Sequence, residues 1–117
     1  MTYDELKTFL LEFPASTLSF PFDETTAVFK VGEKMFALVS PESDPLRVNL
    51  KCDPQDAQAL RFQFPAIQPG YHMNKEHWNS VYLDGSLEPS LVKDMIADSY
   101  RLVLSSLSKK KQRAIRT

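Results

Sequence analysis

The stretch TTAVFKVGEKMFALVS, residues 25–40, decides the fold, because it predicts two strands and the turn between them. Ala27, Phe29 and Val31 recur at every second position, which is the pattern of a half-buried strand. Residues 35–40 form a continuous apolar run of strand length. Between the two runs, Gly32 opens a short polar segment at a position suited to an unusual φ angle. We therefore expect an antiparallel hairpin here.

A third strand follows at once. Residues 41–45, PESDP, predict a second turn, and residues 46–52, LRVNLKC, alternate again. The alternation directs Leu46, Val48, Leu50 and Cys52 toward the core and Arg47, Asn49 and Lys51 outward. Connections this short join neighbouring strands, so the three strands predict an antiparallel meander.

A helix precedes the meander. Thr2 and Glu5 have the spacing of a capping box, and Pro14 marks the end of the helix, because the residue before a proline disfavours helical geometry. The segment STLSFPFDE, residues 16–24, predicts an irregular connection. In this interpretation Phe20, Pro21 and Phe22 hold the connection against the core.

Two further helices follow the meander. Asp53 is a good N-cap with proline after it, which predicts a helix over residues 53–64 with Arg61 on its buried side. Residues 89–107 predict a longer helix that begins near Pro89. The buried stripe of that longer helix is expected to contain Val92, Met95, Ile96, Ser99, Val103 and Leu107.

The last strand lies between these helices, at WNSVYL, residues 78–83, and residues 66–74 read equally as a strand or as an extended loop. The resulting order predicts an α+β fold: a mostly antiparallel sheet with helices packed on one face. We expect one domain over residues 1–108, followed by a basic tail over residues 109–117.

Composition narrows the functional class. The chain has 117 residues and one cysteine, Cys52, so an internal disulfide is excluded and a reducing compartment is expected. We find no apolar run of membrane-spanning length. The N-terminus carries acids where a signal peptide carries bases. These features favour a cytoplasmic protein without a membrane partner, and a monomer is the simplest expectation.

Charge is unevenly distributed along the chain. The net charge is −1, but the tail KKKQRAIRT holds five of the fourteen bases, which leaves nine bases against fifteen acids in residues 1–108. Such a tail fits contact with a polyanion. It fits equally well a solvated helix end, where cations favour the C-terminal dipole.

The segment PGYHMNKEHWNSVYLDG, residues 69–85, gathers both histidines, the single tryptophan and two of the three glycines. His72 and His77 are five positions apart, which is not the spacing of helical metal ligands, and Ser80 lacks a nucleophile elbow. We therefore expect no metal, no cofactor and no catalytic residue, and interpret the chain as a non-enzymatic protein.

Two other interpretations of this segment remain open. In the architectural one, Asn74 caps a helical turn, His77 caps nearby backbone groups, and Trp78 is buried at the start of a strand. In the other, Lys75 and its polar neighbours contact phosphates or base edges of a nucleic acid.

The segment also resembles the MmcQ/YjbR family of small bacterial proteins. The resemblance is carried by YHMNKEHWNSVYLDGSL, residues 71–87, and by DSYRLVLSSLSKKKQR, residues 98–113. It extends to the N-terminal helix, FKVGEKMFALVS and VNLKCDP. The most specific positions are His72, Asn74, Lys75, His77, Trp78, Val81, Leu83, Asp84 and Gly85.

The resemblance implies a CyaY-like, frataxin-like fold and a DNA-binding function, by analogy with a double-wing domain. Frataxins hold iron on an acidic ridge, of which this chain has only Asp4, Glu5 and Glu12, so iron handling is not expected. The residues expected to contact DNA are Lys30, Lys34, Arg47, Lys51, Lys75, Lys109, Lys110 and Lys111. One alternative is a protein- or small-ligand-binding module built on an aromatic–polar patch around Trp78, and another is an enzyme that uses His72 or His77.

Overall fold

The computed structural model describes residues 1–115. Arg116, which belongs to the predicted basic tail, lies outside the described residues. The helices are α1 (Tyr3–Leu11), α2 (Pro54–Gln63), α3 (Pro89–Ser105) and α4 (Lys109–Ile115). The strands are β1 (Thr17–Ser19), β2 (Ala27–Val31), β3 (Lys34–Ser40), β4 (Leu46–Lys51), β5 (Ile67–Pro69) and β6 (Trp78–Leu83).

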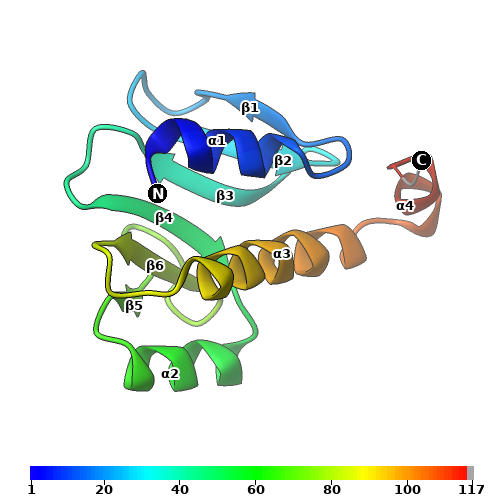
Figure 1. The fold of residues 1–117 in the computed structure, drawn as a ribbon. Helices are drawn as coiled ribbons and strands as arrows, with labels where there is room; N and C mark the ends of the chain where they lie inside the picture. The colour runs from blue at the N-terminus through cyan, green and yellow to red at the C-terminus, as the bar shows by residue number, and fades with distance from the viewer. Residues whose placement is uncertain (116–117) are drawn as a thin grey trace.

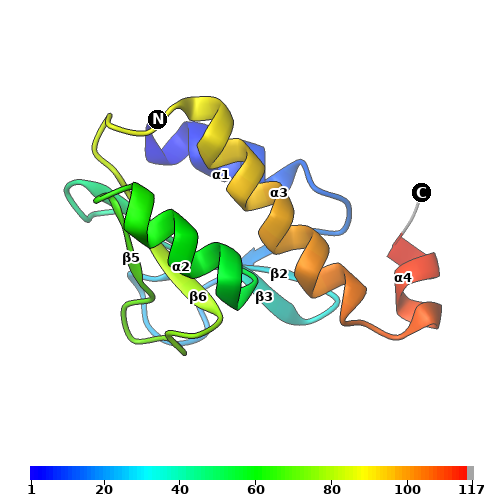
Figure 2. The ribbon, with the colours of Figure 1, turned by 90° about the horizontal axis from the view of Figure 1, so that it is seen from below.

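The six strands form one antiparallel sheet in the order β1-β2-β3-β4-β6-β5. Helices α1, α2 and α3 lie on the same side of this sheet (Figures 1 and 2). The predicted α+β class, with helices on one face of a mostly antiparallel sheet, is therefore confirmed. We call the opposite side of the sheet the open face.

The β2–β3 hairpin forms as its sequence predicts. Gly32 and Glu33 both have positive φ angles, +55° and +70°, and a Cβ at Gly32 would clash with the Leu107 side chain, so the first position of this turn favours glycine. The strand register shifts between Phe29 and Lys30, which inserts Phe36 as a bulge in β3. Phe36 and its neighbour Ala37 are both fully buried.

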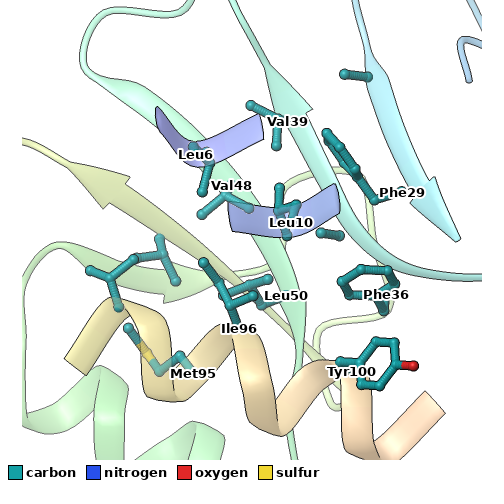
Figure 3. Packing of buried hydrophobic residues seen from close by; sticks show 14 of the residues in the cluster. Leu6, Leu10, Phe29, Phe36, Val39, Val48, Leu50, Met95, Ile96 and Tyr100 are labelled. Atoms are coloured by element: carbon teal, nitrogen blue, oxygen red, sulfur yellow. The ribbon is translucent and has the colours of Figure 1, made fainter. Parts of the chain in front are cut away.

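The main core lies between the sheet and the helices (Figure 3). Leu6 and Leu10 from α1 meet Val39 and Val48 of the sheet, while Ile96 from α3 lies beside Leu50. A group of aromatic rings closes one end of this core. Phe36 and Tyr100 meet edge to face with ring centroids 5.3 Å apart, and Phe13 stacks on Tyr100 with ring centroids 4.7 Å apart. These contacts attach α1 and α3 to the same side of the sheet.

Ser99 is the one polar member of the predicted α3 stripe, and it joins α3 to two strands. Its hydroxyl donates to the carbonyl of Phe36 at 2.6 Å and accepts from the N–H of Lys51 at 2.9 Å. Ser99 is fully buried. It therefore satisfies backbone groups that the β3 bulge and the end of β4 leave without strand partners.

The helix caps confirm the sequence predictions. Thr2 and Glu5 form the reciprocal capping box of α1, and Asp53 accepts from two N–H groups at the start of α2. Residues 66–74 were predicted as either a strand or an extended loop. The structure has both, because β5 forms but covers only three of these residues. The predicted helix over residues 89–107 ends at Ser105, and residues of the basic tail form the separate helix α4.

The expectation for residues 16–24 was wrong. Thr17–Ser19 pair with β2 as an edge strand, because this short segment supplies the backbone groups that the outer side of β2 needs. Phe20 and Phe22 are exposed by 46% and 64%, so neither ring holds the connection against the core. No helix within residues 1–115 is both long and apolar enough to cross a membrane.

Candidate functional site

The charged residues divide between the two layers of the fold. None of the six strands contains an aspartate or a glutamate, and their charged residues are Lys30, Lys34, Arg47 and Lys51. All fifteen acids of the chain lie in helices, helix caps, turns or connections. The chain as a whole is slightly acidic, but its sheet is basic.

Strand register places three of these cations on the open face. Asn49 pairs with Leu38, which pairs with Val28, so these three side chains share one face. Lys30 lies two positions from Val28, and Arg47 and Lys51 lie two positions on either side of Asn49. Because side chains alternate along a strand, all three cations project from the open face. Each is half-buried.

The other cations predicted to contact DNA lie elsewhere. Lys34 lies on the helix side of the hairpin, where its ammonium donates to Ser106 after α3 at 3.4 Å. Lys75 belongs to the β5–β6 connection and donates to the carbonyl of Gly70 at 3.2 Å. Residues 109–111 are exposed on α4, beyond the end of α3 (Figure 1). Three cations therefore share the open face, and the remaining ones are dispersed.

The connection between β5 and β6, residues 70–77, folds over the open face. The N–H of Tyr71 donates to Ser80 Oγ at 2.8 Å, and Asn49 Nδ2 donates to the carbonyl of Tyr71 at 3.3 Å. The Ser80 hydroxyl in turn donates to Asn49 Oδ1 at 2.6 Å. Asn49 and Ser80 are both buried, so this pair fixes the backbone of Tyr71 above the centre of the sheet.

The Tyr71 side chain leaves this anchor and points toward solvent. Tyr71 is 50% exposed as a residue, and the Arg47 guanidinium lies over its ring, 4.5 Å from the centroid. The His72 ring lies beside it, with centroids 4.1 Å apart. His72 has a φ angle of +57°, a left-handed conformation that costs energy for a residue other than glycine. We call Arg47, Tyr71 and His72 the aromatic–arginine cluster.

Arg61 holds the same connection from the helix side. Its Nε donates to Asn79 Oδ1 at 2.7 Å, and its terminal nitrogen donates to the carbonyls of Trp78, at 3.1 Å, and Lys75. Asn79 is 2% exposed. Arg61 was predicted on the buried side of α2, and its role is to join α2 to the start of β6.

The architectural interpretation of this segment is partly right. Asn74 caps one helical turn by accepting from the N–H groups of Glu76 and His77, and Trp78 is 8% exposed, as expected. The expectation that His77 caps backbone groups was wrong, because Asn74 fills that role. The imidazole of His77 has no hydrogen bond within the described residues; its backbone carbonyl accepts from the N–H of Cys52.

Trp78 does not offer a binding surface. It packs with Val28 and Leu38 in a small apolar cluster on the open face, and Met73 lies against it from the connection above. The Asp84 carboxylate is engaged in a local turn. It accepts hydrogen bonds from the N–H and the hydroxyl of Ser86, and these bonds lower the pKa of the carboxyl group. In this part of the molecule, Tyr71 and His72 are exposed beside the half-buried Arg47.

A groove of about 630 Å³ lies between α2 and α3, on the side opposite the open face. Its floor is apolar, and Asp53, Asp56, Asp94 and Asp98 are among its lining residues. Burial, and then the nearby Asp56, Asp53 and Asp98, raise the pKa of Cys52 beside the groove to about 11. The thiol is therefore protonated at neutral pH and is a poor nucleophile or metal ligand. Within residues 1–115, no three histidine, cysteine or acidic side chains gather as a metal site.

Sequence reasoning missed three of these features: the function of Asn49 and Ser80 as a buried anchor, the bridging by Arg61, and the groove. The available signal for the anchor was the occurrence of an asparagine and a serine in the middle of two strands, each next to apolar residues. Buried polar side chains at such positions need hydrogen-bond partners. Here Asn49 and Ser80 bond to each other and to the backbone of Tyr71.

The architecture defines a single α+β domain with an antiparallel sheet, helices on one side and a basic open face on the other. Its sequence matches the family model YjbR over residues 11–102, and the chain belongs to this YjbR family. It is 40% identical to the uncharacterised protein YbdF of Escherichia coli O157:H7 over 97% of this chain and 93% of that protein. It is 33% identical to the uncharacterised protein YjbR of E. coli K12, over 98% of both chains.

Solved structures agree with this assignment. A Deinococcus radiodurans protein with the domain DUF419 superposes with a TM-score of 0.93 at 41% identity, covering 97% of this chain and 87% of that one. A Pseudomonas syringae protein superposes with a TM-score of 0.76 at 28% identity, covering 88% of this chain and 99% of that one. Both solved structures therefore share the fold of this chain.

Proposed function

We propose that this protein binds nucleic acid, with Lys30, Arg47 and Lys51 on the open face contacting phosphates. One observation carries the proposal: three of the four strand cations lie on the open face, while every acid lies outside the strands. Strands that present several cations and no acids favour a polyanion, since each neutralised phosphate releases a counterion. The fold as a whole supplies no such attraction, because the chain has a net charge of −1.

The geometry of the three cations supports this proposal. Each belongs to a strand, so its position is set by the sheet rather than by a mobile loop. Each is also half-buried, which limits the side-chain freedom lost on binding. Lys75 and the α4 lysines are exposed and add further positive charge away from these three cations.

The proposed function is binding without catalysis. Cys52 is held as a thiol, Asp84 is engaged in a turn, and neither imidazole is paired with an acid or a nucleophile among residues 1–115. Such pairing is what general-base and nucleophilic chemistry require. The proposal places the protein in the cytoplasm, where nucleic acid is accessible and a lone thiol stays reduced. Kinship with the CyaY-like folds remains a prediction.

A salt titration tests the proposal. Fluorescence anisotropy of a labelled oligonucleotide is expected to show saturable binding at about 50 mM salt, with a Kd on the order of 10⁻⁶ to 10⁻⁴ M. Three to five phosphate contacts predict that log K falls against log salt with a slope of about −2 to −4. An absence of binding at low salt, or binding that salt does not weaken, would contradict the proposal.

A further inference from the structure

We infer that the open face is selective for unpaired strands, because the aromatic–arginine cluster stacks on an exposed base. This inference rests on the proposed function and specifies its ligand class. Proteins that bind single strands combine a positively charged surface with aromatic side chains on which bases stack. Both parts occur here, and Arg47 belongs to both: it is one of the three open-face cations, and it contacts the Tyr71 ring.

The backbone of Tyr71 is fixed in advance. Its N–H and its carbonyl are both held by the buried pair Ser80 and Asn49, and neither bond uses the side chain. The hydroxyl of Tyr71 has no hydrogen-bond partner among the described residues. Two buried polar residues therefore position a side chain that remains half exposed. A ring held in this way loses little freedom when a planar group packs on it.

The neighbours of Tyr71 suit a base joined to a phosphate. The Arg47 guanidinium lies over one face of the Tyr71 ring, 4.5 Å from its centroid, and is held there by donating to Ser40 Oγ at 2.9 Å. The His72 ring adds a second flat surface, in a backbone conformation that only a well-determined loop maintains. Lys51 and Lys30 then extend the positive surface along the sheet.

Stacking of this kind favours single strands over duplexes. In a duplex the faces of the bases are already stacked on each other, and only their edges and the phosphates are presented. In a single strand each base has a free face, and every base has one, so no sequence preference is expected. The cluster should therefore add affinity for unpaired strands and add nothing for a duplex.

The test compares ligands and variants by anisotropy at fixed salt. The ligands are oligothymidine, the duplex of oligothymidine with oligoadenine, oligouridine and thymidine monophosphate. We expect oligothymidine to bind at least about tenfold more tightly than the duplex. We expect Tyr71→Ala to weaken oligothymidine binding about tenfold, with the salt slope and duplex binding unchanged. Tyr71→Phe should restore binding, because the ring and not the hydroxyl stacks.

Each outcome decides a different question. Thermal unfolding checks that both variants fold, which is expected because the side chain is half exposed. If Tyr71→Ala leaves oligothymidine binding unchanged, or the duplex binds as tightly, the stacking inference is overturned and phosphate binding stands. If neither polymer binds, the proposed function fails as well. Monophosphate binding as tight as that of the strand would make a free nucleotide the ligand and overturn strand selectivity. Equal binding of oligouridine supports the inference, with no discrimination of sugar.

Discussion

Replacing Lys30, Arg47 and Lys51 together by glutamine is expected to weaken oligonucleotide binding on the order of 100-fold at about 50 mM salt. Glutamine removes the charge but keeps part of the aliphatic stem, which matters because all three side chains are half-buried. Three lost phosphate contacts should also make the salt slope less steep by about 2. Anisotropy titrations over a range of salt concentrations measure both quantities.

A matched control removes the same charge from the other layer. Lys7 on α1 and Lys93 and Arg101 on α3 are three cations of the helix side, and their joint replacement by glutamine changes net charge equally. We expect this variant to bind within about threefold of the wild type. Its three cations do not lie on the open face, so they act on the ligand only through the long-range electrostatic field. Equal weakening by both triple variants would show that net charge, and not the open face, governs binding.

Replacing Arg61 by methionine is expected to lower the free energy of unfolding by about 2–4 kcal/mol. Methionine keeps an unbranched stem but leaves Asn79 Oδ1, a buried acceptor, without its donor. It also releases the carbonyl of Lys75 in the connection over the open face. Urea unfolding monitored by the fluorescence of Trp78, the single tryptophan, measures the change.

A double variant shows whether the unpaired acceptor causes this loss. Adding Asn79→Leu to Arg61→Met removes the orphaned group, so the double variant should be more stable than the sum of the two single changes predicts. Arg101→Leu is the control, because its ion pair with Asp98 is exposed on α3 and should be worth less than about 1 kcal/mol. Additive effects at Arg61 and Asn79 would contradict the bridging role.

Local signals in the sequence were enough to predict most of the helices and strands. The capping box at Thr2, the proline after Asp53 and the alternation of residues 46–51 each act over a few residues, so each can be recognised without tertiary information. The short strand β1 could not be recognised in this way. Its three residues have no pattern of their own, and they become a strand because β2 offers a free edge.

The candidate site was harder to predict, because it depends on register. Alternation placed Arg47 and Lys51 outward, and pairing through β3 then brought Lys30 to the same face. The position of Lys34 depended on the hairpin turn, which directs it to the helix side. The buried hydrogen bond between Ser80 and Asn49 joins residues 31 positions apart, so no local pattern shows that these two residues pair. Long-range pairing of this kind decides which polar residues become anchors.

The most direct test of the central claim is a map of backbone amide chemical shifts during titration with oligothymidine. If the open face binds nucleic acid, the largest shifts will fall on β2, β4 and residues 70–77, with α2 and α3 unchanged. Shifts concentrated along the acidic groove between α2 and α3, or confined to the lysines of α4, would contradict this account.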